Sequence, residues 1–174
     1  MNFNKYARAS SFAWISLIFL SPVSVSAAPE VVHNGKHWTA SVIKSKKAKI
    51  CYLHGEPRKS AGKYSRRGKT YLQVTHRPAE KVRDEVSVTA GYGYRKDSEV
   101  TAEIDGQKRT MFTSGGAAWS YSAKDDRALV KSMLRGQELV IKGTSSRGTL
   151  TTDRYSLIGF TAAYRAAGKA CGIK

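Results

Sequence analysis

Hydrophobic and polar side chains alternate with a period of two through much of the chain after residue 27. The alternation is clearest in residues 37–42, 69–74 and 85–90, and it predicts strands that bury one face. Shorter runs predict further strands at residues 50–53, 100–104, 108–112, 118–121 and 139–141. Asp105-Gly106, between two of these runs, is typical of a tight turn between antiparallel strands. The dominant pattern is therefore that of an antiparallel β protein.

Two segments follow the helical period instead. Ser122 and Asp125 can form a capping box in front of an apolar stripe. A second helix is expected to begin near Ser156, and Asp153 is expected to accept backbone hydrogen bonds at the corner leading into it. The predicted fold class is mainly β: an antiparallel β-sandwich or partly closed barrel with two short helices, one of them C-terminal.

The first 27 residues have the three parts of a secretory signal peptide. Lys5 and Arg8 give a positive start, residues 12–20 are almost entirely apolar, and Val25-Ser26-Ala27 suits a signal peptidase. The apolar run is shorter than the roughly 20 residues that a membrane-spanning helix needs. We therefore expect residues 1–27 to be removed near Ala27, and no transmembrane segment to remain.

Residues 28–174 are expected to form a single β domain, since their length suits one domain. Without Lys5 and Arg8 they contain 28 basic and 13 acidic residues, a formal charge of +15. Such an excess favours anionic partners, and export makes envelope components or a host surface more plausible than nucleic acid. The alternative is a basic surface that serves only solubility.

Cys51 and Cys171 are the two cysteines of the sequence. Thiols oxidise outside the cytoplasm, so an exported chain with two cysteines predicts one disulfide. Because the bond would close a long loop, the chain-entropy model gives a stabilisation of roughly 4 to 5 kcal/mol, less any strain. A redox role is the alternative, but neither cysteine lies in a Cys-x-x-Cys motif.

Several short segments together resemble a known family. They are Trp38, residues 75–78 (THRP), 84–87 (DEVS), 91–94 (GYGY), 104–106 (IDG), 118–119 (AW), 143–145 (GTS), and the long segment 147–163 followed by Cys171. In this order they are similar to the invasion-associated locus B family of exported alphaproteobacterial proteins. The resemblance implies a small periplasmic or outer-membrane-associated protein, linked in pathogens to the invasion of host cells. It implies no enzymatic activity, and so no catalytic residues.

No motif of a catalytic or cofactor site is complete in the sequence. Residues 143–149 have the glycine spacing of a phosphate loop but lack its Gly-Lys-Ser/Thr end, so a turn is expected. Residues 91–93 (GYG) lack the third glycine of a dinucleotide loop, and we interpret them as a bend with exposed tyrosines. His33 and His37 flank an Asn-Gly turn rather than sharing a helix face. We therefore expect no cofactor, no metal site and no catalytic residue.

Two basic clusters are the candidate binding residues. Residues 44–49 are expected to form a hairpin tip, and residues 55–68 a long exposed loop. If Cys51 lies in the strand that joins them, both clusters could act as one anion-binding patch, with Tyr64 available to stack or insert. The patch consists of Lys44, Lys46, Lys47, Lys49, Arg66, Arg67 and Lys69. The alternative is that lysines at a strand edge only prevent edge-to-edge aggregation.

The function expected from the sequence is non-enzymatic binding at the cell envelope. The partner would be an anionic envelope component or a host surface, met in the periplasm, at the outer membrane or after secretion. The first alternative is a periplasmic enzyme built from dispersed residues, which a deep polar pocket with convergent histidines or carboxylates would favour. The second is extracytoplasmic nucleic-acid binding, which would need exposed aromatics along a basic groove. The oligomeric state does not follow from the sequence.

Overall fold

The computed structural model describes residues 28–46 and 48–173, so the predicted signal peptide lies outside the described residues. The described chain forms one antiparallel sheet in the order β1-β2-β3-β5-β6-β9-β8-β7-β10-β11-β4. Its strands are β1 (Glu30–Asn34), β2 (Trp38–Lys44), β3 (Lys49–Gly55), β4 (Lys59–Gly62), β5 (Tyr71–Arg77), β6 (Val82–Thr89), β7 (Glu99–Ile104), β8 (Gln107–Ser114), β9 (Ala117–Trp119), β10 (Glu138–Thr144) and β11 (Leu150–Ser156). The helices are α1 (Ala123–Met133), α2 (Phe160–Cys171) and a 3₁₀ turn, η1 (Pro78–Glu80).

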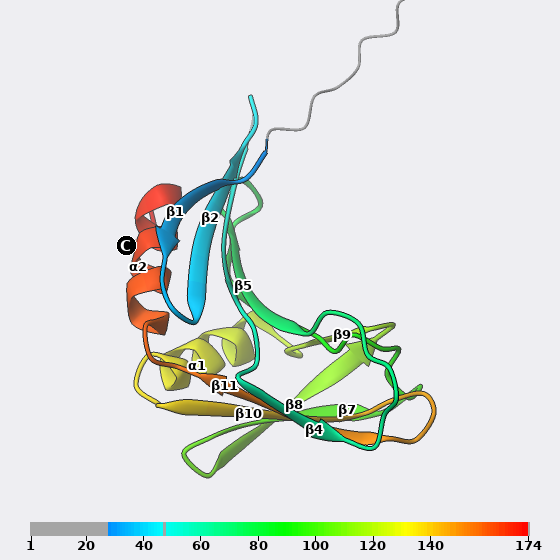
Figure 1. The fold of residues 1–174 in the computed structure, drawn as a ribbon. Helices are drawn as coiled ribbons and strands as arrows, with labels where there is room; N and C mark the ends of the chain where they lie inside the picture. The colour runs from blue at the N-terminus through cyan, green and yellow to red at the C-terminus, as the bar shows by residue number, and fades with distance from the viewer. Residues whose placement is uncertain (1–27, 47, 174) are drawn as a thin grey trace, which may run out of the picture.

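The prediction of a mainly β, antiparallel fold with two helices, the last of them C-terminal, is confirmed. The sheet is single and not closed, since β1 and β4 are its edges. It bends strongly: β1, β2 and β5 stand upright in Figure 1, whereas β4, β7, β8, β10 and β11 run across the lower part. Helix α2 lies along the upright part, and α1 lies in the angle between the two parts.

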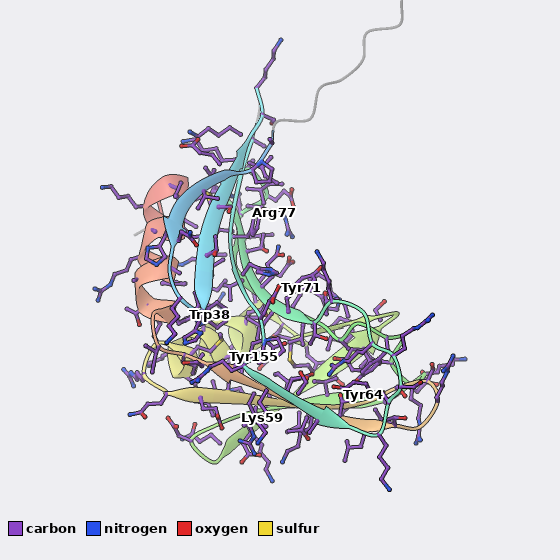
Figure 2. The ribbon with its side chains drawn as sticks, viewed as in Figure 1. Trp38, Lys59, Tyr64, Tyr71, Arg77 and Tyr155 are labelled. Atoms are coloured by element: carbon purple, nitrogen blue, oxygen red, sulfur yellow. A yellow bond between two sulfur atoms is a disulfide. The ribbon has the colours of Figure 1, made fainter. Side chains whose placement is uncertain are left out.

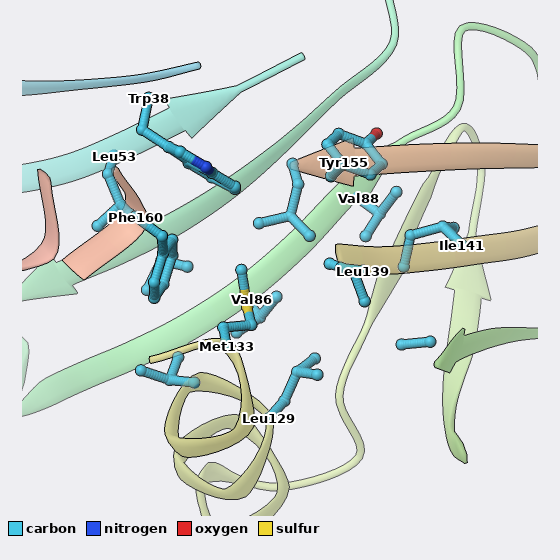
Figure 3. Close-up of a cluster of buried hydrophobic side chains, with 14 of the residues drawn as sticks. Trp38, Leu53, Val86, Val88, Leu129, Met133, Leu139, Ile141, Tyr155 and Phe160 are labelled. Carbon is cyan, nitrogen blue, oxygen red and sulfur yellow. The ribbon is translucent and has the colours of Figure 1, made fainter. Parts of the chain in front are cut away.

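The hydrophobic core lies where the two parts of the bent sheet meet the helices (Figure 3). Trp38 of β2 is fully buried, and its indole Nε1 donates a hydrogen bond to the carbonyl oxygen of Ser156 at 2.7 Å. Its ring meets Phe160 of α2 edge to face, with the ring centroids 4.9 Å apart. Leu129 and Met133 of α1 pack into the same core. Both parts of the sheet therefore share one core, in which each fully buried large side chain contributes roughly 1.5–3 kcal/mol.

The local predictions differ from the structure mainly where strands lack a clear alternation. Residues 55–68 are not only a loop, because β4 lies within them and pairs with β11. The last helix begins at Phe160 rather than near Ser156, because β11 continues through Ser156. Gly159 then turns the chain with φ of +87°, a conformation that favours glycine. Helix α1 begins as predicted: the Ser122 hydroxyl accepts a hydrogen bond from the Asp125 N–H.

One disulfide joins Cys51 of β3 to Cys171 at the end of α2, as predicted. The two Cα atoms are 6.0 Å apart, and 120 positions separate the residues in sequence. The bond fastens the last helix to the upright part of the sheet. No helix within residues 28–46 or 48–173 has the length and apolar character needed to cross a membrane.

Candidate functional site

A cleft of about 570 Å³ lies where three loops of the structure meet. These loops join β4 to β5, β6 to β7, and β10 to β11. Two backbone hydrogen bonds hold them together: the Gly68 N–H donates to the Gly91 carbonyl, and the Ser146 N–H donates to the Gly93 carbonyl, both at 2.8 Å. The cleft is lined by residues 63–68, 91–93, 145–147, Thr149 and Thr151. Its volume falls in the range of small-ligand sites, roughly 300–1,000 Å³.

Arg67, one of the residues that line this cleft, forms a buried ion pair with Asp153 of β11. The Arg67 guanidinium donates to both carboxylate oxygens of Asp153, at 2.7 and 2.6 Å, and its Nε donates to the Ala90 carbonyl at 2.6 Å. The side chains of Arg67 and Asp153 are only 6% and 3% exposed. Burial opposes the charge on Arg67, but the hydrogen bonds that it donates to Asp153 outweigh this effect and raise the pKa of the guanidinium. The Arg67 guanidinium therefore stays charged and is bound by a carboxylate of the protein itself.

Two tyrosines flank this guanidinium. The Arg67 Cζ atom lies 5.5 Å from the ring centroid of Tyr64 and 5.0 Å from that of Tyr92, distances typical of cation–π contacts. The hydroxyl of Tyr92 is bonded to the Thr151 hydroxyl at 2.6 Å, and its ring meets Tyr94 edge to face. Tyr92 is thus fixed in place, whereas Tyr64 is 39% exposed and lies beside the end of β4 (Figure 2). Arg67 consequently positions the aromatic side chains instead of offering its own charge to a ligand.

Three further cations line the cleft: Lys63, Arg66 and Arg147. All three are exposed, and none forms an ion pair with a described residue. No carboxylate lines the cleft, because the nearby Asp153 is buried beneath it and bound by Arg67. The cleft therefore combines an exposed aromatic ring with an uncompensated positive charge.

The turn of residues 145–149 contributes side chains rather than a phosphate loop. The N–H groups of Ser145, Ser146, Gly148 and Thr149 are all used in hydrogen bonds within the protein. Few backbone donors are left to surround a phosphate in the manner of a phosphate loop. The segment is a turn, as predicted, and Arg147 is the cationic side chain that it places at the cleft.

The structure does not bring the predicted basic patch together. Lys44 and Lys49 face each other at the tip of the β2–β3 hairpin, whereas Gly55 pairs with Leu72 at the other end of β3, next to Lys69. Seven strand residues span roughly 20 Å, and Figure 1 shows the hairpin tip and the β4–β5 loop on opposite sides of the molecule. The prediction of one combined patch is wrong, because an extended strand separates its two halves.

Individual members of that predicted patch have different surroundings. Lys44 forms an ion pair with Glu30 at 2.7 Å, and Lys47 lies outside the described residues. Lys46, Lys49 and Lys69 are exposed, and Arg66 lines the cleft. Arg67 was predicted as a surface cation, and this is wrong because its guanidinium is buried against Asp153. Asp153 accepts these bonds instead of backbone N–H groups near the last helix.

The sequence did not indicate that Tyr92, Ser146 and Arg147 lie in one cleft. The sequence did contain one indication of this site, because the glycine-containing segments 91–94 and 143–149 are both typical of bends or turns. Their meeting depends on the pairing of β10 with β7 and on the isolated bridge between Tyr94 and Ser145. Nothing in the local sequence indicates these non-local contacts.

A second polar cluster lies beneath α2. His76 and Asp84 are 0% and 4% exposed. The Asp84 N–H donates to Nδ1 of His76 at 3.1 Å, and the Tyr164 hydroxyl donates to the Asp84 carboxylate at 2.7 Å. Nε2 of His76 has no hydrogen-bond partner within the described chain. This histidine–carboxylate pair is enclosed by protein, so a substrate has no direct access to it.

Another cleft, of about 340 Å³, contains the carboxylates of Glu85 and Asp126. Both carboxylates are already engaged: Glu85 accepts two hydrogen bonds from Arg77, at 2.7 and 2.9 Å, and Asp126 accepts one from the Val86 N–H at 3.0 Å. Within residues 28–46 and 48–173, no group of three His, Cys, Asp or Glu side chains is placed to hold a metal ion.

The fold and the cleft define a class: a mainly antiparallel β protein, closed by one disulfide, that carries a basic cleft with an exposed tyrosine. The chain belongs to the Invasion associated locus B (IalB) protein family, whose family model matches residues 38–168. The match confirms the resemblance seen in the sequence. No curated protein and no solved structure matches the chain.

Proposed function

We propose that this protein is exported and binds, without catalysing a reaction, an anionic component of the cell envelope or of a host surface. The observation that carries the proposal is the cleft that Lys63, Arg66 and Arg147 line together with Tyr64, with no carboxylate in the lining. Unpaired cations in a concave site attract and hold anions more strongly than the same charges spread over a flat surface. Membership of the IalB family agrees with a role at the envelope.

Export is supported by two features of the chain. The signal-like residues 1–27 predict secretion, and the disulfide between Cys51 and Cys171 is of a kind that persists in oxidising compartments. The prediction is checked by separating periplasm, membranes and medium from the producing cell and sequencing the N-terminus of the purified protein. A mature chain that begins at Ala28 supports the proposal, whereas an intact Met1 in the cytoplasm contradicts it.

The enzymatic alternative has less support from the arrangement of side chains. It requires histidines or carboxylates that converge on an accessible pocket. His76 and Asp84 are enclosed, and Glu85 and Asp126 bind protein donors. These groups serve structural contacts, so binding is the better interpretation of the accessible chemistry.

The binding proposal is tested by cosedimentation with lipopolysaccharide or with vesicles that contain anionic lipid, at several salt concentrations. Neutralising Lys63, Arg66 and Arg147 together to glutamine should weaken binding roughly a hundredfold, since each surface cation contributes about 1 kcal/mol. It should also reduce the salt dependence. The matched control is glutamine at Lys108, Lys124 and Lys131, three exposed lysines that lie outside this cleft.

Equal loss of binding in both triple variants would show that only the overall charge matters. Unchanged binding in the cleft variant would contradict the proposed site. A further variant carries glutamine at Lys46 and Lys49 of the β2–β3 hairpin. If this variant loses binding and the cleft variant does not, the hairpin tip is the anion-binding surface instead of the cleft.

A further inference from the structure

We infer that the cleft recognises a single acidic sugar residue, whose ring packs on Tyr64 while its phosphate or carboxylate group is held by Arg66 and Arg147. The inference rests on the proposed function, because it names the class of anion that the cleft takes.

The residues that line the cleft are polar, aromatic or glycine. No alanine, valine, leucine, isoleucine, methionine or phenylalanine side chain faces the cleft, whose surface consists of glycine, serine, threonine, tyrosine, lysine and arginine. An acyl chain needs aliphatic surroundings to leave water, and this cleft offers none. Its occupant is therefore a polar head group or a sugar, not the hydrocarbon part of a lipid.

The hydroxyl groups of the lining are partly free. The Thr151 hydroxyl is hydrogen-bonded to the Tyr92 hydroxyl, and the Ser145 hydroxyl accepts a hydrogen bond from the Thr149 N–H. Ser65 and Ser146 have no side-chain hydrogen bond with a described residue. Free hydroxyls beside an exposed aromatic ring suit a ligand that carries both hydroxyl groups and an apolar ring face, as a sugar does.

The space between the two tyrosines excludes a sandwiched planar base. The Arg67 guanidinium already lies against both rings, at 5.5 and 5.0 Å from their centroids, and Asp153 holds it there. A nucleobase therefore cannot insert between Tyr64 and Tyr92. Only the exposed part of Tyr64 remains for a ligand, and a sugar ring can pack on it from one side. A nucleic acid would need a second exposed aromatic ring on which its next base could stack, and the described lining of the cleft provides none.

The acid group is required by the charge of the cleft. Arg66 and Arg147 come from the β4–β5 and β10–β11 loops and line the same cleft without a carboxylate partner. Planar guanidinium groups bind phosphate and carboxylate at two points. At about 570 Å³ the cleft has the size of a small-ligand site, which suits a sugar residue rather than an extended membrane surface.

The experiment is a calorimetric titration of the oxidised protein, with the disulfide intact. The probes are glucose 6-phosphate, glucuronic acid, glucose, inorganic phosphate and adenosine monophosphate. We expect saturable binding of one or both acidic sugars, with glucose and inorganic phosphate at least about tenfold weaker. Comparing glucose 6-phosphate with glucuronic acid distinguishes a phosphate source from a carboxylate source.

The variants locate the site. Arg66→Gln and Arg147→Gln should each weaken the acidic sugar about tenfold, which is the usual effect of losing a charged hydrogen bond. Tyr64→Leu should weaken it about fivefold through loss of ring packing. Lys124→Gln, an exposed change of equal charge on α1, should leave the affinity unchanged. Equal affinity in all four variants would overturn the assignment to this cleft.

The remaining outcomes separate this inference from the proposed function. If anionic vesicles or lipopolysaccharide bind but neither acidic sugar does, the sugar assignment fails and the envelope-binding proposal stands. If inorganic phosphate binds as tightly as the acidic sugars, the sugar ring is not recognised and the inference fails. If adenosine monophosphate binds at least about tenfold more tightly than both acidic sugars, the base is recognised and the inference also fails. If no anion of any kind binds at low salt, both proposals fail together.

Discussion

Arg67 and Asp153 form a buried two-point ion pair although 86 positions separate them in the sequence. Removing one partner leaves an uncompensated buried charge, which typically costs about 3–5 kcal/mol. We therefore expect Arg67→Met to lower the free energy of unfolding by this amount in urea. The double variant Arg67→Met, Asp153→Leu should recover most of the loss, because no isolated charge remains.

Arg66→Met is the matched control for that prediction. The neighbouring arginine is exposed and has no ion pair with a described residue, so its substitution should change the free energy of unfolding by no more than about 0.5 kcal/mol. A similar small loss for Arg67→Met would contradict the structural role assigned to the buried pair.

Gly55→Ala should destabilise the protein through a direct clash with Trp38. A Cβ atom at Gly55 would lie 2.7 Å from two carbons of the indole ring, and that ring is fixed by its hydrogen bond to Ser156. Overpacking of a filled core costs about 1–3 kcal/mol. Thermal unfolding measures the loss. Gly93→Ala is the control, because a Cβ there meets nothing closer than 4.0 Å.

Replacing Cys51 and Cys171 with serine should lower the free energy of unfolding by up to about 5 kcal/mol. The bond closes a loop across 120 positions, and the unfolded chain gains most freedom when a long loop opens. Urea unfolding of the variant and of the reduced wild type should agree. Thiol titration of the native purified protein should find no free cysteine, and two reactive thiols would refute the bridge.

Stability should fall as the pH drops below about 6.5 because His76 resists protonation in the folded state. Burial lowers the pKa of His76 from its ordinary 6.5, while Asp84 acts to raise it and Arg83 to lower it. Burial raises the pKa of the adjacent Tyr164, which stays neutral in this range. As the pH falls, the histidine therefore takes up its proton in the unfolded chain before it does so in the folded chain. The contribution of neutral His76 to the free energy of unfolding is complete above the ordinary pKa of histidine and is lost at lower pH.

The measurement is the free energy of unfolding at several pH values between about 7.5 and 5. One proton taken up on unfolding gives a slope of at most about 1.4 kcal/mol per pH unit. His76→Asn lacks the titrating ring and should show a smaller dependence on pH, even if its stability is lower throughout. The same slope in both proteins would show that other groups determine the acid sensitivity.

Much of the fold could be predicted from local patterns. The alternation at residues 85–90 corresponds to β6, and the Asp105-Gly106 pair does form the β7–β8 turn, where both residues have positive φ. The disulfide followed from the cysteine count and the expected compartment. Strand β4 could not be predicted, because all four of its residues are exposed and show no alternation of hydrophobic and polar side chains.

The candidate site could be predicted only in parts. The basic loop, the Gly-Tyr-Gly segment and the 143–149 turn were each recognised, but strand order decides that they meet, and strand order is not visible in a local pattern. The same limitation explains the error at Arg67. Arg67 of the β4–β5 loop reaches the buried carboxylate of Asp153 only because β4 pairs with β11.

The bridge between Cys51 and Cys171 also governs what happens when the backbone is cut. A single protease cut anywhere between these two residues leaves both fragments covalently joined through sulfur, and the exposed residues 63–66 lie within that span. A nicked molecule would keep its full mass on an electrophoresis gel without reductant and separate into two bands only after reduction. Proteolytic damage to this protein would thus pass unnoticed unless the sample is reduced first.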